Sequence, residues 1–226
     1  MNSAFNPTLP IDKSMALYWS GTPGCSRSIA ICHAADLAEV PILLLCETNE
    51  NVDQSIRELS YFSRAFENLP VFSLPDWETL PYDNFSPHQD ITSERLNSLF
   101  HLPKLRRGIL VLSISSLMHR LPPREYINSI SLDLRVGQHL EISQMKEELV
   151  YAGYKLVDSV FEHGEFATRG SLLDVFPMGS NEPLRIDLFD GEIESLRSFD
   201  PETQRTAQRL HDPALFPARE SPFHAD

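Results

Sequence analysis

The chain has 226 residues, of which 42% are hydrophobic and 23% are charged, the balance of an ordinary globular protein. Its formal net charge of −13 at pH 7 disfavours sequence-independent DNA binding, because such binding depends on Lys and Arg side chains that neutralise phosphates. The three cysteines, Cys25, Cys32 and Cys46, have no paired spacing, so free thiols and a cytoplasmic location are expected. No apolar run is long enough to span a membrane, and no membrane partner is expected.

The first half of the chain alternates helical and strand-like patterns. Apolar residues recur at helical spacing in three segments, 26–39, 51–66 and 91–102. Short apolar runs that predict strands stand between them, at 41–46, 71–74 and 108–113. The alternation predicts an α/β domain, a parallel sheet with helices on both sides.

A long, proline-punctuated segment, 75–90, interrupts this pattern. Loops of this length in compact domains are usually functional or disordered. Its apolar side chains are expected to pin it to the body of the protein; they are Trp77, Leu80, Tyr82 and Phe85.

The second half begins after Leu121-Pro122-Pro123 and has a different pattern. It predicts a strand at 130–136, a helix at 143–152, and then strands at 156–162, 165–169, 171–176, 184–189 and 192–199. Asp190-Gly191 between the last two is a strong hairpin signal. This grouping predicts a small α+β domain of antiparallel strands. Residues after Asp200 are expected to be irregular or to lead into further chain, as in a fragment.

A glycine-containing loop precedes the first predicted helix, where a phosphate-binding loop would lie. When Gly21 is aligned with the first glycine of the phosphate-binding motif, Ser26 takes the position of the second glycine. Arg27 then takes the position of the lysine, and Ser28 that of the hydroxyl residue. A Cβ at Ser26 crowds the phosphate space, and a guanidinium does not replace the compact lysine ammonium. The expectation is a degenerate nucleotide loop that includes Gly24, in which Ser26 caps the helix. An ATP-binding or ATPase site at residues 21–28 is the alternative.

Other chemistry has little support in the sequence. The histidines show no metal-ligand spacing with Cys or acidic residues, so no metal, cofactor or catalytic residue is predicted. Glu162-His163 beside Glu165 could form an acid/base cluster, but a turn at Gly164 explains these residues equally well.

The strand Leu184–Phe189 alternates between apolar and polar residues. Arg185, Asp187 and Phe189 are predicted to share a solvent-facing side, and Arg169 could lie on the same sheet. An exposed Phe beside Arg is typical of an interface hot spot. Two interpretations stay open: a docking face, or an Arg185 that pairs with Asp187 or Glu194 while Phe189 folds over the hairpin end.

Several long motifs carry a family resemblance. They are Leu74–Asp83, Phe85–Asp90, Glu162–Gly170, Asp174–Pro177 and Leu184–Asp190. These motifs resemble the bacterial transcription-repair coupling factors (Mfd), whose N-terminal region is similar to the excision-repair protein UvrB. The resemblance implies a degenerate P-loop, helicase-like domain 1a at 1–122, an inserted domain 2 at 127–205, and the start of domain 1b or a connector at 206–226.

The resemblance also implies a function. Domain 2 of the family recruits the damage sensor UvrA, and the contact residues carry over onto Arg169, Arg185 and Phe189. The expected role is a non-enzymatic module that brings UvrA to stalled transcription complexes for nucleotide excision repair. RNA polymerase and DNA would be reached only through parts of the family protein that this chain lacks, including its ATP-dependent translocase.

Overall fold

The computed structural model describes residues 4–12, 14–38, 40–79, 87–129, 132–210 and 213–220. They form two compact units, Met1–Asp76 with His101–Arg120, and Trp77–Phe100 with Leu121–Asp226. The segment Trp77–Phe100 groups with the second unit because its helix contributes Leu96 to that unit's core. The predicted domain boundaries at 122, 127 and 205 differ from this grouping and stay a prediction.

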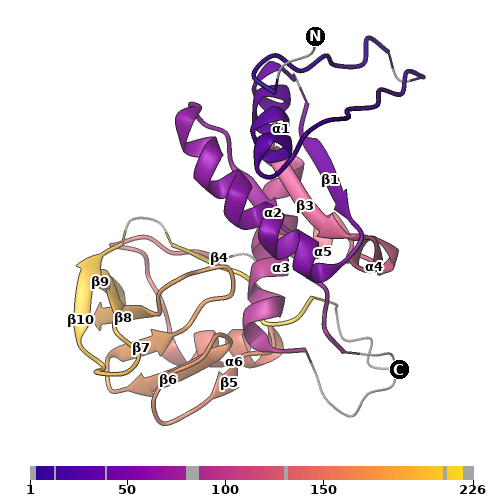
Figure 1. The fold of residues 1–226 in the computed structure, drawn as a ribbon. Coiled ribbons are helices and arrows are strands. Elements are labelled where there is room, and N and C mark those ends of the chain that lie inside the picture. Colours follow the sequence, from indigo (N-terminus) through magenta and orange to yellow (C-terminus); the bar gives the residue numbers. More distant parts are fainter. Residues whose placement is uncertain are drawn as a thin grey trace. The chain divides into compact units, whose positions relative to one another are not determined.

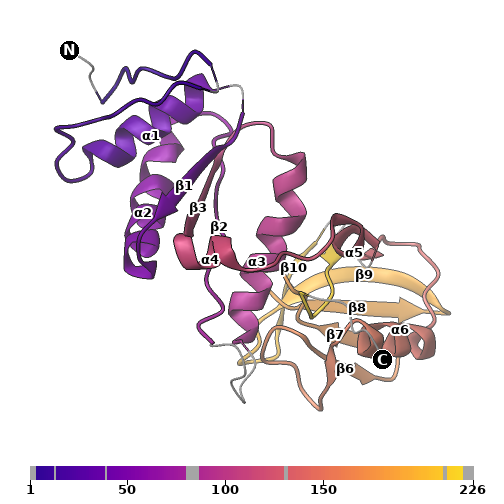
Figure 2. The same cartoon turned by 90° about the vertical axis from the view of Figure 1, so that its right-hand side faces the viewer.

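The first unit is built on a parallel sheet of three strands, as expected; β1 and β3 are labelled in Figure 1 and all three strands in Figure 2. The strands are β1 (Ile42–Cys46), β2 (Val71–Ser73) and β3 (Ile109–Ser113), in the order β1-β3-β2. The central strand β3 is buried throughout, as its unbroken apolar sequence predicts. Helices α1 (Ser26–Leu37) and α2 (Asn49–Phe62) pack on one face through Cys32 and Leu59.

Several boundaries in this unit differ from the prediction. Helix α2 begins after Thr48, whose side chain accepts the Asn51 N–H, and it gives way to a short 3₁₀ turn, η1 (Ser63–Ala65), before Phe66. A short helix, α4 (Ile114–Met118), follows β3 directly and was not predicted. Leu43 and Leu45 on the other face of β1 are about half exposed, so helices do not cover both sides of the sheet at this strand.

The second unit contains an antiparallel sheet with two flanking helices. The helices are α3 (Gln89–His101), which continues into η2 (Leu102–Lys104), and α6 (Ile142–Tyr151); a shorter helix is α5 (Arg124–Ser129). The sheet strands are β5 (Lys155–Leu156), β6 (Glu165–Arg169), β7 (Leu172–Val175), β8 (Leu184–Phe189), β9 (Glu192–Phe199) and β10 (Thr206–Arg209). They lie in the order β10-β9-β8-β7-β6-β5, and Figure 2 shows β6 to β9 side by side.

One face of this sheet forms the core of the unit. Phe166, Leu173 and Ile186 are fully buried there against Met145 and Leu149 of α6. The ring of Tyr154 lies in the same core, and its hydroxyl donates to the Phe216 carbonyl and accepts the Met178 N–H. A second, smaller apolar cluster covers part of the opposite face; it consists of Val160, Ala167, Phe176 and Phe199.

The prediction was wrong in three places in this unit. Residues after Asp200 are not irregular, because β10 extends the sheet and β11 (Ala214–Leu215) pairs with β4 (Leu132–Asp133). The strand predicted at 156–162 is limited to β5, which runs parallel to β6. The strand predicted at 130–136 is limited to β4 among the described residues. Short pairings of this kind come from tertiary contacts that local patterns do not encode.

A buried ion pair ties the proline-punctuated segment to the end of the described chain. Arg95 Nε and Nη2 donate to the two carboxylate oxygens of Glu220 at 2.7 and 2.8 Å, and Arg95 is fully buried. Trp77 Nε1 also donates to Glu220 Oε2 at 2.8 Å, and its ring lies 5.0 Å from the Arg95 guanidinium carbon. Trp77 therefore anchors its segment as expected, whereas Leu80, Tyr82 and Phe85 lie outside the described residues.

Candidate functional site

Strand β8 shows the alternation that its sequence predicts. Leu184 and Ile186 are completely buried and Leu188 is 6% exposed, while Phe189 is 73% exposed. Arg185 and Asp187 are partly exposed on the same outward side. The sheet thus has one face in the large core. The other face, which we call the outward face, carries polar groups, Phe189 and a small buried cluster around Phe176 and Phe199.

Strand register places the predicted partner-binding residues on this outward face together. Arg169 of β6 lies opposite Leu172 of β7, which lies opposite Asp187 of β8. Because side chains two residues apart share a face, Arg185 and Phe189 flank Asp187 on the same side. The spatial grouping of Arg169, Arg185 and Phe189 therefore follows from the pairing of three adjacent strands.

Arg185 is held in place by an ion pair with the neighbouring strand. Its Nε and Nη2 each donate to one carboxylate oxygen of Asp174 at 2.8 Å, and its guanidinium carbon lies 4.7 Å from the Phe199 ring centroid. The hydrogen bonds to Asp174 raise the pKa of Arg185. The ion-pair partner is thus Asp174, directly opposite Arg185 in the β7–β8 register, and not Asp187 or Glu194, which one of the two open interpretations proposed.

Arg169 and Phe189 are more accessible than Arg185. Arg169 is exposed, and its Nη2 donates to the Asp158 carbonyl at 2.8 Å and to Ser159 Oγ at 2.7 Å. These bonds hold the guanidinium at the rim of a surface hollow of about 660 Å³, which Leu156, Val157 and Asp158 help to line. Phe189 ends β8 next to the turn in which Asp190 and Gly191 both have positive φ. One cationic side chain, Arg169, and one apolar side chain, Phe189, thus lie exposed at the ends of strands β6 and β8.

The glycine loop before α1 has a different arrangement from the one predicted for it. Ser26 is the first helical residue, and its Oγ donates to the Pro23 carbonyl, so Ser26 does not cap the helix; Cys25 occupies the cap position. The physical reason is that the chain already turns helical at Cys25. Gly21 and Gly24 adopt positive φ, with open space around each.

The hydroxyl that a nucleotide site would use for its metal is engaged inside the protein. Ser28 Oγ donates to Glu58 Oε2 of α2 at 2.5 Å, and Ser28 is buried. This hydrogen bond is the largest cause of the lowered pKa of Glu58, and the nearby Arg27 also contributes. A carboxylate at this position repels phosphate and competes for Ser28 and Arg27. A hollow of about 400 Å³ lies beside the loop, lined by Ala4, Pro7, Tyr18, Trp19, Ser20, Thr22 and Ala30.

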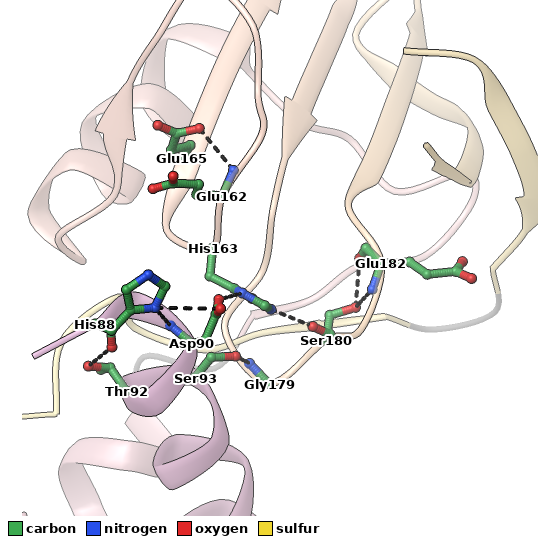
Figure 3. Close-up of polar contacts among 10 residues, drawn as sticks. All are labelled: His88, Asp90, Thr92, Ser93, Glu162, His163, Glu165, Gly179, Ser180 and Glu182. Atoms are coloured by element: carbon green, nitrogen blue, oxygen red, sulfur yellow. Dashed lines mark hydrogen bonds and ion pairs between the residues drawn. The ribbon is translucent and has the colours of Figure 1, made fainter. Parts of the chain in front are cut away.

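The Glu162–His163–Glu165 cluster forms structural contacts (Figure 3). His163 Nδ1 lies 2.7 Å from Asp90 Oδ1, and its Nε2 lies 2.7 Å from the Ser180 carbonyl. Glu165 Oε2 accepts the backbone N–H groups of Phe161 and Glu162, which closes the turn before β6. Both ring nitrogens of His163 are therefore occupied, and the contact with Asp90 links this turn to the start of α3, whereas the Glu165 oxygen is occupied within the turn itself.

Three further observations concern the cysteines, metals and membranes. Cys25, Cys32 and Cys46 are free, and burial raises the pKa of the Cys32 thiol to about 11. Within the described ranges, no group of three or more His, Cys, Asp or Glu residues could hold a metal ion. No helix in that same part of the chain is long and apolar enough to cross a membrane.

Sequence reasoning missed some residues of the outward face. Asp174 positions Arg185, and Arg197 and Arg209 lie beside it in register on β9 and β10. The strand that contains Arg197 was predicted. Which face of the sheet Arg197 lies on, however, depends on the register shift between β8 and β9 at Asp187/Leu188.

Comparisons with known proteins agree with the motifs. Residues 132–220, which include β4 to β11, match the family described as the UvrB interaction domain. The transcription-repair-coupling factor of Escherichia coli (strain K12) is 40% identical over 222 residues, 98% of this chain and 19% of the relative. That of Haemophilus influenzae is 48% identical over 185 residues, 79% of this chain and 16% of the relative.

A more distant relative shows the same pattern. The transcription-repair-coupling factor of Myxococcus xanthus is 34% identical over 204 residues, 88% of this chain and 17% of the relative. The chain thus spans between 16% and 19% of the length of these three curated relatives. Over the segment that it spans, the chain belongs to the transcription-repair-coupling factor family and contains a UvrB interaction domain.

Proposed function

We propose that this chain is a non-catalytic docking module that recruits UvrA to stalled transcription complexes for transcription-coupled nucleotide excision repair. The observation that carries the proposal is the match of residues 132–220 to the UvrB interaction domain. The outward face of the sheet lies within that segment and presents Arg169, Arg185 and Phe189. These residues are the proposed contacts with UvrA.

The chemistry of the three residues suits a protein partner. Arg side chains bind carboxylates through two parallel hydrogen bonds, and an exposed Phe gains most when it fills an apolar pocket. Arg185 is already oriented by Asp174 and Phe199, so little side-chain entropy is lost when a partner binds it. A net charge of −13 opposes the competing possibility, binding to a nucleic-acid backbone.

The loop before α1 supports a non-enzymatic role for the first unit. Arg27 stands where a phosphate-binding lysine would be, and the Ser28 hydroxyl is bonded to Glu58. RNA polymerase contact and DNA translocation are proposed for the remainder of the family proteins, beyond the segment that this chain spans.

The direct test is retention of the chain on immobilised, purified UvrA. We expect the double variant Arg169→Ala, Phe189→Ala to fold normally, because both side chains are exposed, and to bind UvrA at least about 30-fold more weakly, the effect of losing about 2 kcal/mol at a hot spot. Arg185→Ala alone is a poor test, since it leaves the buried Asp174 carboxylate unpaired.

A matched control is available on α2. Arg57→Ala, Tyr61→Ala also removes one exposed arginine and one exposed aromatic ring, but from the first unit. This control should bind UvrA as the unmodified chain does. Equal retention of the unmodified chain and the Arg169/Phe189 variant would reject the proposed contacts, and no binding by either would reject the function itself.

A further inference from the structure

Three arginines form a row across neighbouring strands of the outward face. Arg185 of β8 lies opposite Arg197 of β9, and Arg197 lies opposite Arg209 of β10. Residues that are directly opposite in an antiparallel pair have Cβ atoms about 5 Å apart on one face of the sheet. The row is therefore a continuous line of cations at the β8–β10 end of the sheet, in a chain whose net charge is −13.

Among the residues that the structure describes, one member of the row has an ion-pair partner. Arg185 pairs with Asp174, whereas Arg197 and Arg209 form no ion pair with any described residue. The Nε atom of Arg197 is buried and has no hydrogen-bond partner among the described residues. Arg209 is exposed.

This arrangement costs stability in the isolated chain. Like charges that are directly opposite in a sheet repel each other, and a buried donor without a partner loses its hydration without replacement. The large core lies on the other face of the sheet, and on the outward face Arg197 lies two residues from the buried Phe199. An external anion that binds both guanidinium groups would offset the repulsion between Arg197 and Arg209.

We infer that Arg197 and Arg209 extend the docking face and bind a carboxylate-bearing surface of UvrA. The inference rests on the proposed function and adds two contact residues to it. Arg185 and its neighbour Phe189 would lie at the centre of the contact, with Arg169 on one side and the Arg197–Arg209 pair on the other. The partner surface is then expected to combine an apolar pocket with acidic side chains, so that charge steers and orients the encounter.

A protein partner fits this face better than a nucleic acid. The row is short, and carboxylates of the same face interrupt the cationic surface, with Asp187 beside Arg185 and Glu192 opposite Phe189. Such a mixed pattern matches a mixed protein surface, whereas a DNA backbone presents uniform negative charge that Asp187 and Glu192 would repel.

Charge reversal tests the inference on the 226-residue chain with purified UvrA. Arg197→Glu and Arg209→Glu should each weaken binding about tenfold or more at low salt, with a smaller loss at high salt. Arg197→Lys should keep most of the affinity, since it keeps the charge. Arg57→Glu on α2 is the matched control and should change nothing. Thermal melting checks that each variant is folded. If Arg197→Glu does not fold, Arg209→Glu still tests the inference, because Arg209 is exposed.

The outcomes separate this inference from the proposed function. Unchanged affinity of both reversals, with loss of binding by Arg169→Ala, Phe189→Ala, would overturn the role of the row and leave the docking face in place. Unchanged affinity of all variants would overturn both. Reversals that abolish binding to a DNA duplex, but not to UvrA, would assign the row to nucleic acid and overturn the inference.

Discussion

Arg95 and Arg185 both hold a carboxylate through two hydrogen bonds, but the two pairs differ in their exposure to solvent. The Arg95–Glu220 pair is buried and adds Trp77 to its contacts, so it joins three parts of one unit. Arg185 keeps 17% of its side chain exposed beside Phe199 on the outward face. The first pair is enclosed within its unit, whereas the second orients a partly exposed guanidinium that we propose as a contact with UvrA.

The Arg95–Glu220 pair predicts a non-additive stability pattern. Arg95→Leu leaves a buried carboxylate without its partner, and we expect it to lower the free energy of unfolding by about 3–5 kcal/mol. The double variant Arg95→Leu, Glu220→Leu should lose less than the single variant, because no charge stays buried alone. Urea denaturation of the two variants measures this difference, and a double variant less stable than Arg95→Leu would contradict it.

Glu58 predicts a pH-dependent effect on stability. Its pKa is lowered in the folded chain, mainly by the Ser28 hydroxyl, so its contribution is present above the ordinary carboxyl range and is lost as pH falls through the lowered value. Glu58→Gln should therefore lower the melting temperature near pH 7, by the equivalent of about 1 kcal/mol or less for this partly exposed group. The difference from the unmodified chain should shrink in acid. A difference that grows as pH falls would contradict this.

At the scale of elements, glycines with positive φ decide how tightly the loops can pack. Gly179 has φ 78°, and a Cβ there would overlap the Phe216 ring, whereas Gly170 has φ 62° and open space around it. Gly170→Ala should cost about 1–2 kcal/mol from backbone strain alone. Gly179→Ala should cost clearly more, because a buried aromatic ring must also move. Chemical denaturation of both variants compares them, and equal losses would contradict the packing argument.

Most elements were predictable from their own patterns. The three strands of the first unit and the strands β6 to β9 follow apolar runs or alternation bounded by turns, and α3 and α6 follow helical spacing. The strands β10 and β11 were not predictable, because β10 is exposed throughout and each exists only through its partner. Local sequence carries no sign of such pairing.

The outward face was predictable only in part, because two register irregularities, one between β8 and β9 and one between β9 and β10, decide the rest. Counting back from the Asp190-Gly191 turn, Phe189 pairs with Glu192 and Leu188 with Ile193, which would place Arg185 opposite Leu196. A register shift between Asp187 and Leu188 instead places it opposite Arg197. A one-residue shift moves a side chain to the other face. The sequence thus predicted the Arg185–Phe189 face but not the arginine row.

At the scale of the whole molecule, the two units support different chemistry. The first has a nucleotide-like loop whose Ser28 hydroxyl bonds to Glu58, and the second has a sheet with an open, arginine-bearing face. We therefore expect calorimetry with Mg-ATP to detect no binding tighter than about 0.1 mM, which corresponds to about −5.5 kcal/mol. Tighter binding would show that the loop is a working nucleotide site.

The central claim is that UvrA docks on the outward face of the antiparallel sheet. Replacing Phe189 with the photoreactive amino acid benzoylphenylalanine keeps an aromatic side chain at a position that is 73% exposed. Illumination of a mixture with purified UvrA should give a covalent complex from position 189. It should give none from position 61, an exposed tyrosine on α2. Cross-linking from position 61 and not from position 189 would contradict the account.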